Sequence, residues 1–225
     1  MSGYGNLQKI RDGKRTFAIT PHIPGGFILP DKLIKIGEVA KKYNGVLKIT
    51  SGQRILITNL KQEDLPAIWE ELDMVPAVKE QNSVKNVEIC PANYCKRSKY
   101  PIIGIGMKIS KKFHGMSLPC RTKIGVAGCR NACASTYSKD IGVLVDLDKK
   151  FFVTVGGSAG YHPRSADIVT KGLNEQETFN LIEVILNYYN ENANPGEKMG
   201  DFIDRISIEN FRKEVLKVAN LVENL

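Results

Sequence analysis

Apolar and polar residues along roughly the first ninety positions follow two different periods, which predicts strands and helices in turn. Apolar runs bounded by Gly, Asn, Ser or Pro predict strands at 15–20, 46–50, 55–58 and 83–89. Apolar residues three and four apart predict two helices, one with Asp31 as its N-cap and one over 62–72. The first helix should carry on one face Leu33, Ile36, Val39 and Ala40. The order β-α-β-α-β predicts an α+β half-domain of ferredoxin-like type.

The rest of the chain is α/β in character. A helix is predicted at 107–113, a strand at 122–127, the start of a helix at 131–137, and a hairpin formed by 141–146 and 151–155. Asn174 and Ser207 each stand where an N-cap would begin a C-terminal helix. We therefore expect two domains, residues 1–82 and residues 83–225.

Composition narrows the class of protein. Of 225 residues, 42% are hydrophobic and 25% are charged, which is enough for a packed core. No window approaches roughly eighteen consecutive apolar residues, and the first residues lack an apolar signal segment, so the expected location is the cytoplasm, away from membranes. The net charge of +8 calls for an anionic partner: nucleic acid, an acidic protein or a polyanionic cofactor. A solvated, lysine-rich surface would also account for it.

Five cysteines without a secretory signal are better interpreted as free thiols than as disulfides. Four form two pairs, Cys90 with Cys95 and Cys129 with Cys133, and soft thiolates grouped in this way select iron–sulfur clusters or zinc. Zinc knuckles usually have two residues between paired cysteines, so spacings of four and three favour a cluster. The predicted helix would place the second pair on one side and near a positive dipole end. Cys120 shares neither spacing and is not expected to be a ligand.

The motifs around these cysteines resemble those of the siroheme-dependent sulfite and nitrite reductases. The resemblance rests on Cys-x4-Cys, on Leu-Pro-Cys-Arg-Thr-Lys at 118–123, and on Gly-Cys-Arg-Asn-Ala-Cys at 128–133. It extends to Pro-Gly-Gly at 24–26, Thr-Ser-Gly-Gln-Arg at 50–54, Asp-Ile-Gly at 140–142 and Gly-Gly at 156–157. The length is similar to that of the small, single-repeat, assimilatory-type sulfite reductases. The implied fold is a ferredoxin-like half-domain followed by an α/β domain that binds siroheme and a [4Fe–4S] cluster.

The resemblance also implies which residues do the chemistry. The cluster ligands would be Cys90, Cys95, Cys129 and Cys133, and Cys133 would also bridge to the siroheme iron. Siroheme is a polycarboxylate and the substrate is an anion. Basic side chains are therefore needed both to hold the siroheme and to bind the substrate. The implied catalytic residues are Arg54, Lys85, Arg121 and Lys123. The implied cofactor-binding residues, besides Cys133, are Asn131, Gly52, Gln53, Arg54 and Arg130, with Lys96 and Arg97 as further anion-site candidates.

Three departures from the family pattern concern this site. The first cysteine pair has four intervening residues where the family usually has five, and Cys120 replaces a residue that is usually basic. The Thr-Ser-Gly-Gln-Arg turn is closer to the nitrite reductase version. Because basic residues of one repeat face the siroheme of the other repeat in larger relatives, a single-repeat chain is expected to form a homodimer or a heterodimer with a paralogue.

The leading hypothesis is a reductase that converts sulfite to sulfide with electrons from a ferredoxin-like protein drawn to the basic surface. The chain carries no flavin or nicotinamide fingerprint of its own. Nitrite is the alternative substrate. A second hypothesis is a non-catalytic iron–sulfur and siroheme electron-transfer subunit. A third is a zinc-stabilised nucleic-acid binder, although no groove-reading motif supports nucleic acid as a partner.

Overall fold

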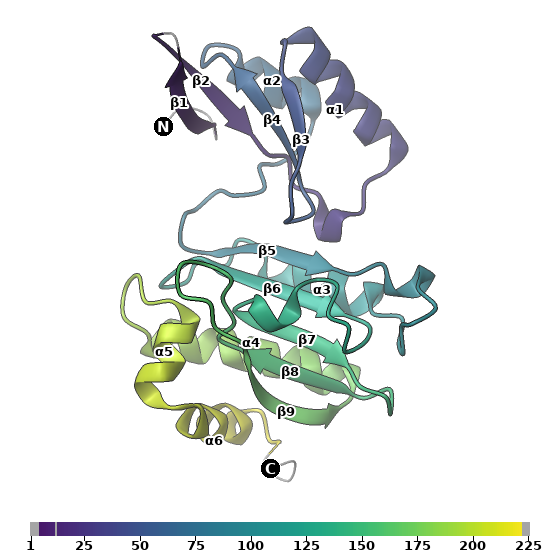
Figure 1. Cartoon of the computed structure of the whole chain (residues 1–225), viewed down its shortest axis with the longest axis vertical. Coiled ribbons are helices and arrows are strands. Elements are labelled where there is room, and N and C mark those ends of the chain that lie inside the picture. Colours follow the sequence, from purple (N-terminus) through teal and green to yellow (C-terminus); the bar gives the residue numbers. More distant parts are fainter. Residues whose placement is uncertain (1–4, 12, 222–225) are drawn as a thin grey trace. The chain divides into compact units, whose positions relative to one another are not determined.

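The computed structural model describes residues 5–11 and 13–221, and the chain divides into two units between residues 79 and 80 (Figure 1). The first unit is a four-stranded antiparallel sheet of order β1-β2-β4-β3 with two helices. Its elements are β1 (Asn6–Arg11), β2 (Lys14–Ile19), α1 (Pro30–Lys42), β3 (Val46–Ile49), β4 (Ile55–Leu60) and α2 (Leu65–Leu72). One apolar cluster joins both helices to β2 and β4, so the helices cover one face of the sheet.

Two local expectations for this unit were wrong. The first helix begins at Pro30 after Leu29, so Asp31 lies in the first helical turn and is not the N-cap. A carboxylate in the first turn still interacts favourably with the helix dipole, which explains why the pattern resembled a cap. Leu33 is exposed, whereas Ile36 and Val39 are buried as expected.

The second unit is a five-stranded mixed sheet of order β5-β6-β7-β8-β9. The strands are β5 (Val84–Ile89), β6 (Thr122–Ala127), β7 (Ile141–Val145), β8 (Phe151–Val155) and β9 (Asp167–Leu173). The first three run parallel, and β8 and β9 join antiparallel. The predicted strand at 83–89 therefore exists, but it begins this second sheet and is not the last strand of the first. Sequence periodicity identifies a strand without identifying its partner.

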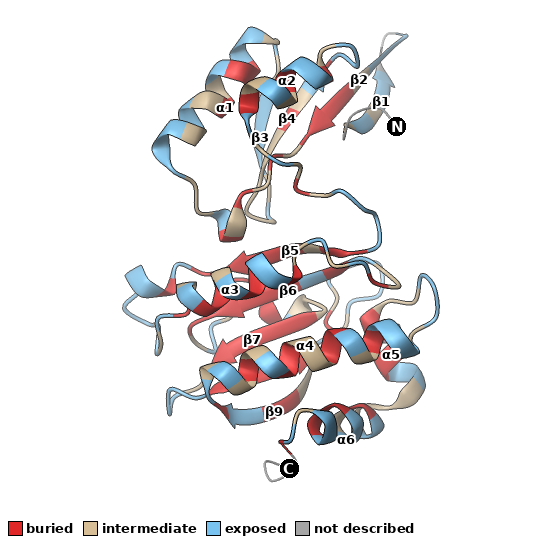
Figure 2. Cartoon of the chain, turned by 180° about the vertical axis from the view of Figure 1, so that it is seen from behind, coloured by how far each residue is buried: buried red, intermediate tan, exposed pale blue. Residues whose placement is uncertain are grey.

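Helices cover one face of the second sheet, as the opposite views of Figures 1 and 2 show. They are α3 (Ile103–Phe113) and α4 (Glu175–Asn192); α6 (Ile208–Val218) packs against α4 and β9, and α5 (Met199–Ile206) packs against α6. An ion pair between Lys112 and Glu183 at 2.7 Å joins α3 to α4. The short turn η3 (Thr136–Ser138) lies on the other face. Because both faces are covered, every residue of β7 and β8 is buried.

The capping predictions for the C-terminal helices are confirmed. The Asn174 side chain accepts a hydrogen bond from the Glu177 backbone at 2.9 Å, and the Glu177 carboxylate accepts one from the Asn174 backbone at 2.8 Å. The Ser207 hydroxyl accepts from the Asn210 N–H at 3.3 Å. Within the described residues, none of the helices combines the length and apolar character needed to cross a bilayer.

Candidate metal centre and anion site

The four paired cysteines lie on the loops that leave the carboxyl ends of β5 and β6. These strands are parallel neighbours, with Ile89 opposite Val126, so their carboxyl ends meet at one edge of the sheet. Cys90 directly follows β5, and its N–H donates to the Val126 carbonyl at 3.0 Å. Cys129 follows β6 after one glycine. The topology therefore brings together two pairs that the sequence separates by more than thirty residues.

Gly128 joins the two cysteine loops. Its N–H donates to the Cys90 sulfur at 3.3 Å, and its carbonyl accepts from the Lys99 N–H at 2.8 Å. A Cβ at this position would lie 2.2 Å from the Ser98 hydroxyl oxygen and 2.7 Å from the Ala92 Cβ. A glycine is thus required here by close approach of the first loop.

The segment after Cys129 is not the helix that the sequence predicts. It is a series of tight turns in which the N–H groups of Ala132, Ser135 and Ser138 each donate to the carbonyl three residues earlier. Ala132 and Ser135 have left-handed φ values of 54° and 52°, which a right-handed helix does not allow. Cys129 and Cys133 are therefore not on one helix face, and no helix dipole points at them.

The thiols differ in their surroundings. Cys90 is buried, Cys129 is partly exposed, and Cys95 and Cys133 are exposed; all of them and Cys120 are free thiols. Burial raises the pKa of Cys90, and negative charge on Cys133 and Cys129 raises it further, so these three sulfurs lie within electrostatic reach of one another. Across residues 5–11 and 13–221, no group of three or more His, Cys, Asp or Glu side chains is arranged to hold a metal ion.

The donor set nevertheless fits an iron–sulfur cluster. Cluster-bound thiolates are tuned by N–H donors to sulfur. Two such donors are in place: the Gly128 backbone to Cys90, and the Asn131 side chain to Cys133 at 3.0 Å. Of the expected cofactor-binding residues, Asn131 therefore contacts a candidate ligand, whereas Arg130 is ion-paired with Asp146 on the loop after β7.

A shallow cavity of about 550 Å³ adjoins the Cys133 loop. Five of its nine lining residues carry a hydroxyl group; the lining consists of Ala132, Ser135, Tyr137, Ser138, Ser158, Ala159, Pro163, Arg164 and Ser165. The Arg164 guanidinium is engaged by Asp167 at 2.6 Å and by Asp204 at 2.8 Å. The Ser138 hydroxyl already donates to the Ser135 carbonyl at 3.0 Å. The hydroxyls of Ser135, Ser158 and Ser165 can donate hydrogen bonds to carboxylates of a bound polyanion.

Three of the expected catalytic residues lie at the opposite, amino end of the same strands. Lys85 is on β5 near the register pair Val84 with Thr122, and its ammonium donates to Gln81 at 3.0 Å. Arg121 and Lys123 are exposed on either side of buried Thr122, so they face the same way as predicted. At about 3.3 Å per residue, β6 places Lys123 roughly 20 Å from Cys129. Within one chain, the basic pair and the cysteines are therefore at opposite ends of the sheet.

Asp140 is a residue at this amino end that sequence reasoning missed as a functional group. Its carboxylate accepts the Lys123 N–H at 2.8 Å. Burial raises its pKa to about 6, while that hydrogen bond and the charges of Lys123 and Arg121 oppose the rise. The Asp-Ile-Gly motif includes Asp140, but the sequence does not show what this carboxylate contacts. The pairing of β6 with β7 brings it next to the basic pair, Arg121 and Lys123.

In the first unit, the expected residues Gly52, Gln53 and Arg54 form the turn between β3 and β4. The Thr50 hydroxyl accepts the Arg54 N–H at 3.2 Å and closes the turn, and Gln53 has a left-handed φ of 58°. The Pro-Gly-Gly turn touches it, because a Cβ on Gly26 would lie 2.9 Å from the Gln53 Cβ. The structure thus brings together the two motifs of this unit.

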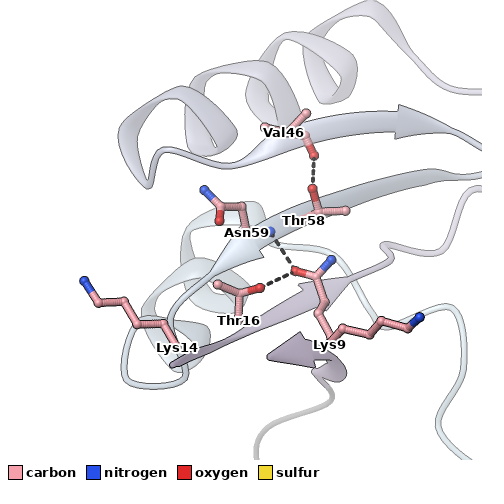
Figure 3. Close-up of a pocket in the computed structure, with 7 residues that line it drawn as sticks. Lys9, Lys14, Thr16, Val46, Thr58 and Asn59 are labelled. Carbon is pink, nitrogen blue, oxygen red and sulfur yellow. Dashed lines mark hydrogen bonds between the residues drawn. The ribbon is translucent and has the colours of Figure 1, made fainter. Parts of the chain in front are cut away.

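A cleft of about 920 Å³ lies at the other end of this sheet, shown in Figure 3. It is lined by Gln8, Lys9, Lys14, Thr16, Val46, Thr58 and Asn59. The Gln8 side-chain oxygen accepts both the Thr16 hydroxyl and the Asn59 N–H at 2.9 Å. None of the expected site residues lines it.

Comparison with known proteins agrees with this arrangement. The model of the nitrite/sulfite reductase ferredoxin-like half domain matches residues 8–75, and that of the nitrite and sulphite reductase 4Fe-4S domain matches residues 80–221. An assimilatory-type sulfite reductase of Nitratidesulfovibrio vulgaris is 33% identical over 205 residues, covering 90% of this chain and 94% of the relative. A nitrite reductase [NAD(P)H] of Bacillus subtilis is 33% identical over 207 residues, covering 91% of this chain but 25% of the relative.

The fold is shared with a solved structure, the NirA protein of Mycobacterium tuberculosis. The TM-score is 0.76 at 15% identity, over 93% of this chain and 41% of that one. The expected fold class is thereby confirmed, and the family matches and the named relatives confirm the expected enzyme class and cofactor pair. The chain belongs to the nitrite and sulphite reductase family, whose members are oxidoreductases that use siroheme and a [4Fe–4S] cluster.

Proposed function

We propose that this protein reduces sulfite to sulfide. The observation that carries the proposal is the pair of cysteine loops joined at Gly128, with N–H donors on the Cys90 and Cys133 sulfurs. The relative that this chain spans almost end to end is named an assimilatory-type sulfite reductase, which favours sulfite over nitrite. The nitrite reductase relative is about four times as long as the region that matches this chain, so most of that protein has no counterpart here.

We propose that Cys90, Cys95, Cys129 and Cys133 would hold the cluster, and that Cys133 would also hold the siroheme. When bound, the two groups would supply the one-electron chemistry that reduction of an oxyanion requires. The protein would supply two further contacts. Asn131 orients the Cys133 thiolate, and the serine hydroxyls of the cavity beside it would donate to the carboxylates of the siroheme. Arg54, Lys85, Arg121 and Lys123 are proposed to bind the anionic substrate and the cofactor edge.

The strand polarity of the second unit supports a two-chain active site. Because β6 holds Lys123 roughly 20 Å from Cys129, one small oxyanion cannot touch both ends of one chain. We propose that a twofold dimer places the basic pair of each subunit at the cysteine end of its partner, as a homodimer or with a paralogue. An acidic, ferredoxin-like protein is the proposed electron donor, in keeping with the net charge of +8.

The cofactor assignment is tested by an optical spectrum of anaerobically purified protein, with iron, zinc and acid-labile sulfide assays and extraction of siroheme. Siroheme with about four irons per chain, and a higher kcat/KM for sulfite than for nitrite, is the expected result. A cluster without siroheme, from a host that makes siroheme, would favour the electron-transfer subunit. Zinc alone would favour the nucleic-acid binder.

The two-chain site is tested by mixing two inactive variants. One carries Cys133→Ser and the other carries Lys123→Ala, and subunits are exchanged by gentle dissociation. Each mixed dimer would contain one intact site, so about a quarter of wild-type activity should return. Mixing that restores nothing although subunits exchange, or a fully active monomer on gel filtration, would contradict the two-chain site.

A further inference from the structure

The amino ends of β6 and β7 gather a carboxylate and two cations that the fold alone brings together. Ile124 pairs with Ile141, so Lys123 and Asp140 stand side by side as the strands begin. The Asp140 carboxylate accepts the Lys123 N–H at 2.8 Å, and it interacts electrostatically with both Lys123 and Arg121. The two basic residues thus share one acidic neighbour.

Asp140 is fixed more firmly than a surface aspartate. Its own carbonyl accepts the Gly156 N–H at 2.8 Å, and the preceding carbonyl of Lys139 accepts the Gly157 N–H at 2.9 Å. The Lys139 ammonium itself is engaged by the buried Glu88 carboxylate at 2.6 Å. The backbone around Asp140 is therefore held on both sides, and Lys139 is committed to another carboxylate.

The charges around Asp140 are unequal. Arg121 and Lys123 supply two positive charges beside it. Tyr189 on α4 interacts with Asp140 and also with Cys120, Glu197 and Asp201, so two further carboxylates lie in the same environment. Burial raises the pKa of Tyr189, so its hydroxyl stays protonated, and it donates to the Glu197 carbonyl. Burial also raises the pKa of Asp140 to about 6. An added anion beside this carboxylate would raise that pKa further.

We propose that Asp140 is the positioning residue of the Arg121–Lys123 anion site: it fixes the Lys123 backbone and takes up one proton when an oxyanion binds. The proton comes from solvent, is held on the carboxylate while the oxyanion occupies the site, and returns to solvent when the oxyanion leaves. The inference rests on the proposed function only in placing the substrate oxyanion at Arg121 and Lys123. Binding of the oxyanion is then coupled to proton uptake by Asp140, a residue that need not touch the substrate.

Calorimetry with sulfate tests the proposal on the holoprotein, because no reductant is present and sulfate keeps its charge between pH 6 and 8. Titrations in two buffers of different ionisation enthalpy measure the protons taken up. In the wild type, we expect close to one proton at pH 7.5 and an affinity that falls up to about tenfold per pH unit above pH 6. Asp140→Asn keeps an oxygen for the Lys123 N–H, and it should bind at least about tenfold more tightly at pH 7.5 with no proton uptake.

Three further variants locate the effect. Lys123→Ala should abolish the sulfate signal, and Cys120→Ser should leave the proton uptake unchanged. Asp140→Ala removes the acceptor as well as the charge, so it should bind sulfate more weakly than Asp140→Asn at every pH. Wild-type proton uptake in Asp140→Asn, or equal binding by the asparagine and alanine variants, would overturn the proposal. Loss of the proposed function would be seen separately, as a holoprotein without siroheme absorption or sulfite turnover.

Discussion

Replacing Asp140 by asparagine should stabilise the protein at neutral pH. Desolvation raises the pKa of this carboxyl from 3.8 to about 6 in the folded protein. Between these values the folded state binds more protons than the unfolded state, so stability falls as pH rises. Well above pH 6, ionised Asp140 lowers the free energy of unfolding by about 3 kcal/mol, because each pKa unit represents about 1.36 kcal/mol. About 2 kcal/mol of it develops between pH 4.5 and 7.5.

The assay is differential scanning calorimetry of wild type and Asp140→Asn at several pH values between 4.5 and 7.5. For a chain of this length, 1 kcal/mol shifts Tm by roughly 2–4 °C. The Tm advantage of the variant should therefore grow by roughly 4–8 °C across the range. Asp148→Asn, at an exposed position in the β7–β8 turn, is the matched control and should show no such growth. An advantage that stays constant or shrinks as pH rises would mean that Arg121 and Lys123 outweigh the desolvation of Asp140.

Three other variants have definite expected outcomes. Gly128→Ala forces the two cysteine loops apart, so iron per chain should fall, whereas Gly104→Ala, which meets no atom within 4 Å, should retain iron. Lys139→Met leaves the Glu88 carboxylate buried without its cation, and should cost about 3–5 kcal/mol, measured by thermal or urea unfolding. Asn131→Ala removes an N–H donor to a cluster thiolate, so a redox titration should find a more negative cluster potential with iron content unchanged; an unchanged potential would contradict that role.

Features encoded by neighbouring residues were predictable from the sequence. The N-cap at Asn174 formed as predicted, with Glu177 completing a capping box, and the segments 141–146 and 151–155 paired as a hairpin. Each depends on contacts within a few positions of the chain, where propensity and turn chemistry act directly. The cysteine spacing likewise reported the donor set, because ligand type is a property of the residues themselves.

Features that depend on distant contacts were not predictable in the same way. The helix expected at 131–137 is replaced by turns because Ala132 and Ser135 take left-handed conformations. Neither residue type favours that conformation, so the surrounding structure must impose it. The strands β1 and β9 and the helix α5 were also not predicted from the sequence. The segments of β1 and β9 mix polar and apolar residues, so packing against neighbours decides their conformation. The short helix α5 was missed although its apolar residues share one helix face, which is a signal that the sequence contains.

The most consequential long-range feature is the direction of β6. Arg121 and Lys123 lie at its start and Cys129 follows its end, so residues within nine positions of one another in sequence are roughly 20 Å apart. A motif that is continuous in sequence thus contains two half-sites. Each half gains neighbours from adjacent strands: Cys90 at the carboxyl end and Asp140 at the amino end. If two chains exchange these ends, every active site combines thiolates from one subunit with the Asp140-controlled basic pair of the other. Substitutions at 121, 123 or 140 should then alter anion affinity while leaving the iron content of their own subunit unchanged.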